Sequence, residues 1–159
     1  MVFFMCQNKY AIDILKIFIM KKCKLGSTPV ATCTKLSKKD KGEAINSTMY
    51  KRLVGNLMYL TATRPDFMYT IILISIFMES HKYSHWNVGN IIWRYIIGTQ
   101  DYGIWYSSSE DNSLVRYINN DFAGSIDDTK STCRYAFHLG IGLISWASKK
   151  QSIFTISFA

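Results

Sequence analysis

The hydrophobic period of the chain changes once, at Gly98, and this change limits the folds available to the sequence. Before Gly98, apolar residues recur every three to four positions, the spacing that places them on one face of a helix. After Gly98 they alternate with other residues, as in half-buried strands, and turn residues separate the runs. The sequence therefore predicts an α+β protein in which helices are followed by an antiparallel β-meander.

Local signals mark several ends of the predicted elements. Ser47 suits a helix N-cap, Pro65 suits a first helical turn, and Gly98 suits a helix C-terminus. The connection that follows the first helix carries Gly26 and many lysines, so we expect it to be exposed. Residues 3–6 resemble the end of a strand. The predicted helices are residues 10–22, 47–64, 65–80 and 85–99, and the predicted strands are residues 102–107, 113–119, 133–140, 143–148 and 152–157.

The positive charge is concentrated in the first part of the chain. Residues 1–64 hold twelve Lys/Arg and three Asp/Glu, and residues 65–159 hold seven and eight, which together give the 19 and 11 of the whole chain. A solvated surface and an anionic partner such as nucleic acid are about equally good explanations of this asymmetry. The candidate nucleic-acid-binding residues are Lys38, Lys39, Lys51 and Arg52.

Membrane insertion and secretion are both disfavoured by the sequence. The longest apolar stretch, residues 67–78, is too short to span a bilayer core of roughly 30 Å. The N-terminus has no basic leader before its apolar run, and the four cysteines form no CxxC pair. We therefore expect an intracellular protein with reduced cysteines and no contact with a membrane.

The segment RYINNDFAGSIDDTKSTCRYAFHLG, residues 116–140, combines acidic and amide side chains with a preceding apolar run. Carboxylates at the end of a strand can hold Mg²⁺ for phosphodiester chemistry. The alternative for Asp127 and Asp128 is an ordinary polar turn, which we favour. His81 and His85 are four residues apart, but no third ligand is evident, so a polar helix entrance is favoured over a zinc site.

Several short sequence motifs, called words below, occur in a characteristic order. They are YKRLVGNLMYLTATRPDFMY, HWN with RYIIGT, YGIWY, NDFAGSIDDTKST and LISWASKKQ. In this order and spacing, the chain resembles the copia-type retrotransposon Pol polyprotein, from about residue 3 to the last residue. The resemblance implies that residues 1–101 form the thumb and connection helices at the C-terminal end of a reverse transcriptase. Residues 102–159 then form the opening strands of an RNase H-like domain.

The resemblance also implies that the catalytic residues are missing or altered. The family's polymerase Asp-Asp turn would precede Met1. The first Mg²⁺-binding Asp of RNase H falls on Asn119, two residues before the DFAG word, so Asp121 is the carboxylate left on this strand. The next family carboxylate would follow residues 155–157, just beyond Ala159. We therefore expect no catalytic site, no metal and no cofactor in this chain.

Other departures from the family agree with a loss of selection. Ile76, Ile91 and Ile97 stand in helices where the family has basic or polar side chains, and Arg134 replaces a glycine of the KSTSG word. These departures look like drift. For folding, we also expect Gly89 to lower the stability of its helix by up to about 1 kcal/mol relative to alanine.

Two classes of function therefore remain open. The first is a catalytically inactive remnant of a Pol polyprotein, whose family performs RNA-directed DNA synthesis and degrades RNA in RNA/DNA hybrids. The second is a basic module that binds an RNA/DNA hybrid or a DNA duplex weakly and without sequence preference. We also expect self-association, because the strand edge near residues 114–118 and apolar residues such as Ile144, Trp146, Phe154 and Ile156 would lack cover.

Overall fold

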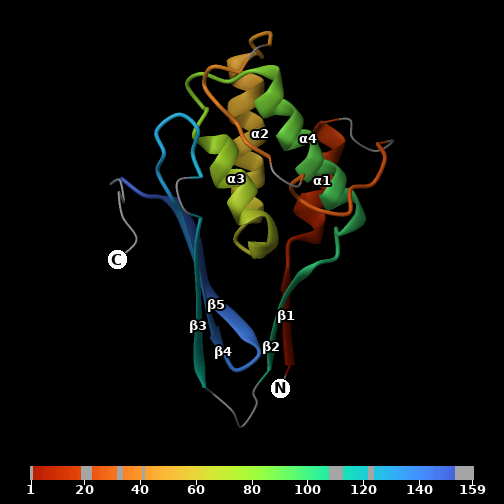
Figure 1. Cartoon of the computed structure of the whole chain (residues 1–159). Helices are drawn as coiled ribbons and strands as arrows, with labels where there is room; N and C mark the ends of the chain where they lie inside the picture. The colour runs from red at the N-terminus through yellow and green to blue at the C-terminus, as the bar shows by residue number, and fades with distance from the viewer. Residues whose placement is uncertain are drawn as a thin grey trace.

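The computed structural model describes residues 2–18, 23–31, 34–40, 42–107, 113–121 and 124–152. Within these ranges, four α-helices pack together at one end of the molecule, and two antiparallel sheets extend from them (Figure 1). The helices are α1 (Asn8–Ile17), α2 (Ser47–Leu60), α3 (Met68–Ser75), which continues a short 3₁₀ turn η2 (Pro65–Phe67), and α4 (Tyr83–Gly98).

The predicted helices are confirmed, with shifted ends. The N-cap of α2 is Asn46, whose side chain accepts a hydrogen bond from the Met49 N–H at 3.1 Å, and Ser47 is the first helical residue. The helix α1 ends at Ile17, and the predicted extension from Ile19 to Lys22 lies outside the described residues. The helix α4 ends at Gly98 as predicted.

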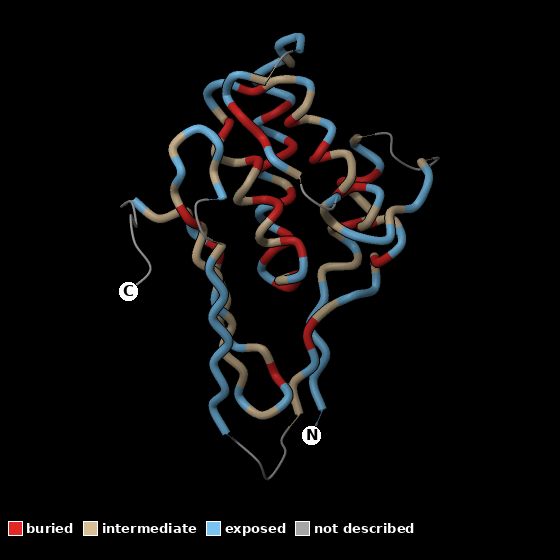
Figure 2. The backbone as a smooth tube through the Cα atoms, viewed as in Figure 1, coloured by how far each residue is buried: buried red, intermediate tan, exposed pale blue. Residues whose placement is uncertain are grey.

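The apolar core lies almost entirely among the helices (Figure 2). It contains the fully buried side chains of Tyr50, Leu53 and Leu57 on α2, which pack with those of Ile92 and Ile96 on α4. Met58 on the same helix is 41% exposed, because the buried stripe of α2 turns toward Leu60.

Gly89 has a packing role that helix propensity does not reveal. It is buried where α4 faces α2, and a Cβ added at this position would lie 2.8 and 2.9 Å from the two methyl carbons of Leu53. Glycine therefore allows the two helices to approach at this point. The cost of glycine in helix propensity is therefore offset by the closer packing of α4 against α2.

The sheets differ from the predicted meander in one respect. The strands β3 (Leu114–Asp121), β4 (Thr132–Leu139) and β5 (Gly142–Lys150) form an antiparallel meander, in the order β3-β4-β5. The strand β2 (Gly103–Ser107) instead pairs with β1 (Val2–Cys6), so its inclusion in the meander was wrong. This pairing joins residues on either side of the expected boundary between residues 101 and 102. Most of the predicted strand at residues 152–157, including Phe154 and Ile156, lies outside the described residues.

The lysine-rich connection before α2 is less exposed than predicted. Leu36 and Ser37 are each 8% exposed, and the Gly26 N–H donates to the Arg94 carbonyl of α4 at 3.0 Å. Ala44 forms an isolated bridge with Lys82 at the start of α4. The connection therefore covers α4, while the side chains of Lys38 and Lys39 stay exposed.

The three-stranded sheet contacts the helices through α3 and the end of α2. The indole Nε1–H of Trp146 on β5 donates to the Thr61 carbonyl, the C-cap of α2, at 2.9 Å. The guanidinium of Arg134 on β4 lies 4.2 Å from the ring centroid of Tyr69 on α3. Across the ranges that the structure describes, no helix combines the length and the apolar character needed to cross a membrane.

Candidate functional site

The position of the expected Mg²⁺ ligand lies near the C-terminal end of β3. Asn119 is exposed there, and in the strand register it is opposite Arg134 of β4. An amide oxygen can coordinate a metal but carries no negative charge, and a guanidinium on the neighbouring strand opposes a bound cation. Asn119 and its surroundings are therefore poorly suited to hold Mg²⁺.

Asp121 points the same way as Asn119, because the two residues are two apart on one strand. Its carboxylate accepts a short hydrogen bond from the Thr132 N–H, directly opposite on β4. Gly124 lies close enough that a Cβ there would collide with this carboxylate. The intervening Phe122 and Ala123 of the DFAG word lie outside the described residues. The contacts of Asp121 are therefore those of a residue that closes the β3–β4 connection.

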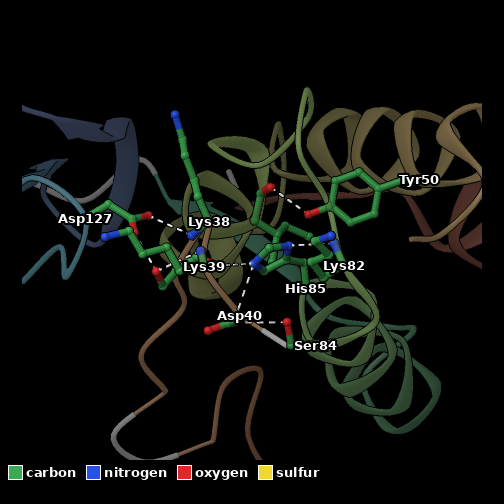
Figure 3. Close-up of polar contacts among 10 residues, drawn as sticks. Lys38, Lys39, Asp40, Tyr50, Lys82, Ser84, His85 and Asp127 are labelled. Carbon is green, nitrogen blue, oxygen red and sulfur yellow. Dashed lines mark hydrogen bonds and ion pairs between the residues drawn. The ribbon is translucent and has the colours of Figure 1, made fainter. Parts of the chain in front are cut away.

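Asp127 joins the β3–β4 connection to the lysine-rich connection. Its carboxylate accepts hydrogen bonds from the Ser37 hydroxyl at 2.5 Å and from the Lys38 N–H at 2.9 Å (Figure 3). Although partial burial opposes ionisation, these two donors hold the pKa of Asp127 below its usual value. The favoured interpretation of a polar turn is therefore incomplete, because the turn makes a contact across 90 residues.

Asp128 makes a separate contact with the end of β5. Its carboxylate lies 2.7 Å from the Lys150 ammonium. Partial burial would raise its pKa, but the Lys150 ammonium and the Ser125 hydroxyl outweigh this effect and lower the pKa of Asp128 to about 2. Both aspartates of the SIDDT word therefore connect the β3–β4 connection to other segments, Asp127 to the lysine-rich connection and Asp128 to the end of β5.

His85 is buried at the start of α4. Its Nδ1 accepts a hydrogen bond from the Lys82 N–H at 2.9 Å, and its Nε2 lies 3.1 Å from the Ser37 carbonyl (Figure 3). The ring stacks on Phe77 at 3.9 Å between centroids. Burial is the largest influence and lowers the pKa of His85. With Nδ1 accepting, the neutral ring donates through Nε2.

His81 is also a packing residue. Its ring stacks on Tyr50 at 4.5 Å, and its Nε2 lies 3.0 Å from the Ile45 carbonyl. These contacts support the polar helix entrance favoured for the two histidines. Among the residues described, no three His, Cys, Asp or Glu side chains come together in a way that could hold a metal ion.

The four candidate nucleic-acid-binding residues are all exposed, but they come from two segments. Lys38 and Lys39 lie in the connection that covers α4, and Lys51 and Arg52 lie in the first turns of α2. None of the four forms an ion pair with a described carboxylate. Arg64 differs, since it is 3% exposed and binds Asp66 and the Thr99 carbonyl. The basic surface is therefore smaller than the charge count suggests.

Comparison with known proteins identifies the origin of the chain. It is 39% identical over 145 residues, 91% of its length, to the retrovirus-related Pol polyprotein from transposon RE2 of Arabidopsis thaliana. It is 38% identical over 159 aligned positions, 95% of its length, to the corresponding polyprotein from transposon TNT 1-94 of Nicotiana tabacum. The chain belongs to the Pol polyprotein family of copia-type retrotransposons. The resemblance inferred from the sequence words is therefore confirmed.

This Pol segment spans only about a tenth of these relatives, namely 10% of the first and 12% of the second. A shorter relative is secreted RxLR effector protein 161 of Plasmopara viticola, which is 36% identical over 109 residues that cover 68% of this chain and 77% of that protein. No protein-family model and no solved structure matches the chain.

Sequence reasoning missed two features of the Pol segment. One is the contact of Asp127 with Ser37, which connects segments far apart in the chain. The other is the position of Arg134 opposite Ser148 on β5, where both side chains contribute to a cavity beside α3. Arg134 was noted as a departure from the family. Its neighbours depend on the β4–β5 register, which no local signal specifies.

Proposed function

We propose that the chain is a catalytically inactive segment of a copia-type Pol polyprotein. In this proposal, residues 1–101 are the thumb and connection segment of a reverse transcriptase, and residues 102–159 are the opening part of an RNase H-like domain. The family's activities, RNA-directed DNA synthesis and RNA degradation in RNA/DNA hybrids, are not performed by this chain. The single observation that carries the proposal is the amide of Asn119 at the expected Mg²⁺-binding position.

Charge supports this inactive assignment. RNase H chemistry uses metal ions to activate water and to stabilise the leaving oxygen, and carboxylates hold these ions. On the described face of β3 and β4, Asn119 is neutral, Arg134 is cationic and the Asp121 carboxylate accepts the Thr132 N–H. The charge of Asp121 is balanced by that of Arg134, so this face has no surplus negative charge to hold a divalent cation.

The experiment is RNA cleavage in an RNA/DNA hybrid with Mg²⁺, measured under single-turnover conditions. We expect no cleavage above that of the Asp121→Asn variant, because the chain presents too little negative charge to bind the metal ion. Primer extension is expected to be absent as well. Cleavage by the unaltered chain that Asp121→Asn abolishes would contradict the proposal.

A second candidate function is binding of a nucleic-acid backbone. It is favoured by the exposure of Lys38, Lys39, Lys51 and Arg52 and by the charge surplus of residues 1–64. The partner would be an RNA/DNA hybrid or a DNA duplex inside the cell, bound weakly and without sequence preference. No contact with a membrane is part of this proposal.

Salt dependence tests the second function. With about four to six phosphate contacts, log affinity should fall against log salt with a slope of roughly −4 to −5. Charge reversal at the four basic residues should weaken binding and flatten this slope. Reversal of Arg116, an exposed arginine on β3, is the matched control and should have a smaller effect. An unchanged slope in the fourfold variant would remove the case for this surface.

Self-association is a third element of the proposal. The strand β3 is at the edge of its sheet, and Leu114 and Ile118 on it are 64% and 54% exposed. An open edge with apolar side chains favours pairing with another copy. Sedimentation velocity should show oligomers that Ile118→Lys reduces, and a concentration-independent monomer would contradict this element.

A further inference from the structure

A turn in the lysine-rich connection displays two adjacent basic side chains. In this turn the Asp40 N–H donates to the Ser37 carbonyl at 3.2 Å, and Lys38 and Lys39 occupy the two central positions. The Lys39 N–H also donates to the Ser37 hydroxyl at 3.1 Å. Ser37 is buried, whereas Lys38 and Lys39 are exposed. Residues 37–40 are called the basic turn below.

The helix α4 holds the basic turn from one side (Figure 3). The neutral ring of His85 donates from Nε2 to the Ser37 carbonyl at 3.1 Å. At the other end of the turn, the Ser84 hydroxyl donates to the Asp40 carboxylate at 3.0 Å. Leu36, directly before the turn, belongs to the helical core. These contacts fix the two ends of the basic turn, and its corner is held by a different residue.

Asp127, in the β3–β4 connection, holds the corner from the other side. Its carboxylate accepts from the Ser37 hydroxyl at 2.5 Å and from the Lys38 N–H at 2.9 Å. Hydrogen bonds to a charged acceptor are roughly twice as strong as those between neutral groups. Because Asp127 binds the first two residues of the turn, it restricts the backbone from which both lysine side chains extend.

Charge and position predict opposite effects of Asp127 on the binding of a polyanion. A carboxylate beside Lys38 repels phosphate groups, so on charge alone Asp127 weakens binding. An ordered turn, in contrast, has already lost the backbone entropy that a free loop would lose when its lysines contact a ligand. Within the described ranges, no ion pair joins Asp127 to Lys38 or Lys39, so both ammonium groups are available to a ligand.

We propose that Asp127 is a positioning residue for the binding of a nucleic-acid backbone, and that it acts through Lys38 and Lys39 without contacting the ligand. By ordering the basic turn, it lets the two lysines meet the phosphate backbone together. The inference rests on the second function proposed above and extends it, because it gives residues 102–159 a part in binding.

The test compares Asp127→Ala with Asp128→Ala in the full chain. Both variants lose one negative charge at adjacent positions, but Asp127 contacts the basic turn and Asp128 contacts Lys150 at the end of β5. Fluorescence anisotropy measures the affinity for a short RNA/DNA hybrid over a range of salt concentrations. We expect Asp127→Ala to weaken binding by about threefold to tenfold, because the lysines are no longer preorganised.

The salt dependence should change in the same variant. The slope of log affinity against log salt should flatten by up to about 2 in Asp127→Ala, since two phosphate contacts depend on the basic turn. Asp128→Ala should bind as tightly as the unaltered chain or more tightly. If charge alone decided affinity, the two variants would both bind more tightly, and by similar factors.

A double-mutant cycle separates positioning from a general effect on the fold. In a chain that carries Lys38→Ala and Lys39→Ala, Asp127→Ala should cause no further loss of affinity, because the residues through which it acts have been removed. A loss that persists in this background would contradict the inference. Should Asp127→Ala fail to fold, Ser37→Ala carries the test. It keeps the net charge and should weaken binding by about twofold to fivefold.

Amide exchange provides a readout that needs no ligand. The Lys38 amide should exchange faster in Asp127→Ala than in Asp128→Ala, and an unchanged rate would overturn the inference. Equal or tighter binding by Asp127→Ala than by Asp128→Ala would overturn it too, while leaving the second function in place. Absence of salt-dependent binding by the unaltered chain would instead rule out the second function and this inference together.

Discussion

The helices α1–α4 and the three-stranded sheet β3–β5 differ in how far their apolar side chains are buried. On the helices, side chains such as Leu57, Ile71 and Ile92 have no exposed surface. In the sheet, no described apolar side chain is buried, and Ile118 and Ile144 are 54% and 46% exposed. Since burial of apolar surface is the main source of folding free energy, the helices provide most of the stability.

The sheet is positioned mainly by polar and aromatic contacts with the rest of the chain. These are the Trp146–Thr61 hydrogen bond, the contact of Arg134 with Tyr69 and the hydrogen bonds of Asp127 with Ser37 and Lys38. Each such contact contributes on the order of 1 kcal/mol, less than one buried aliphatic side chain. The comparison teaches that the sheet depends on the helices, whereas the helices have a core of their own.

The largest expected effect is a difference in the free energy of unfolding when an isoleucine is truncated to alanine in each of the two regions. Ile92→Ala should lower the free energy of unfolding by about 2–5 kcal/mol, because it leaves a cavity in the core between α2 and α4. Ile144→Ala should lower it by less than about 1 kcal/mol, because this side chain is already half exposed. Urea unfolding measures both changes.

Amide hydrogen exchange gives an independent control for this pair. Amides of α2 and α4 should exchange more slowly than those of β3, which is an edge strand. Equal losses of stability in the two isoleucine variants, or slower exchange in β3 than in α4, would show that the sheet has a core that the structure does not reveal.

The sequence predicted the helices and most strands because their signals are local. Periodicity identifies the buried face of α2, and Gly98 marks the end of α4. The pairing of β1 with β2 was missed because residues 2–6 and 103–107 are far apart in the chain, and no local pattern selects a partner. The burial of Ser37 was missed for the same reason, since its partner Asp127 lies 90 residues away.

The residues of the candidate site could be proposed from the sequence, but their surroundings could not. The family motifs align Asn119 and Asp121 with the expected metal position, and this alignment, which stays a prediction, needs only the order of residues. The side chains opposite them, Arg134 and Thr132, follow from the β3–β4 register. A register requires the turn geometry and the packing of both strands, which a single sequence does not supply.

The next largest expected difference in stability is between alanine substitutions at two glycines within the helices. Gly89→Ala should destabilise the chain by about 1–3 kcal/mol, because the new methyl group would overlap the buried Leu53. Gly55→Ala on α2 should stabilise it by roughly 0.5–1 kcal/mol, because the added Cβ would meet no atom within 4 Å beyond the adjoining backbone of its own helix, and alanine favours the helix. Thermal unfolding of both variants measures the difference.

This pair separates helix propensity from packing. If propensity alone decided stability, both substitutions would stabilise the chain by similar amounts. A stabilising Gly89→Ala would therefore show that α2 and α4 are farther apart than the structure places them, and it would weaken the view that the helices provide the tightly packed region.

The smallest expected effect is the pH dependence of stability. The helices and the sheet are expected to lose stability in different pH ranges. Burial lowers the pKa of His85 below 6.5, so the unfolded state binds more protons and stability falls as the pH drops below 6.5. The pKa of Asp128 is about 2 when folded and 3.8 when unfolded. Its contribution is therefore complete above pH 3.8 and is lost as the pH falls through 2.

The Asp128→Asn variant isolates the second of these windows. At pH 6 it should lower the free energy of unfolding by no more than about 1 kcal/mol, because the Lys150–Asp128 pair is partly exposed and screened by solvent. The difference from the unaltered chain should shrink as the pH falls from 4 to 2. The loss between pH 6.5 and 5 should be the same in both proteins, since it arises at His85 among the helices. Urea midpoints at pH 8, 6, 5, 4 and 2 test this, and a variant that removes the loss near pH 6 would show that Asp128 and His85 are coupled through the Ser37 connection.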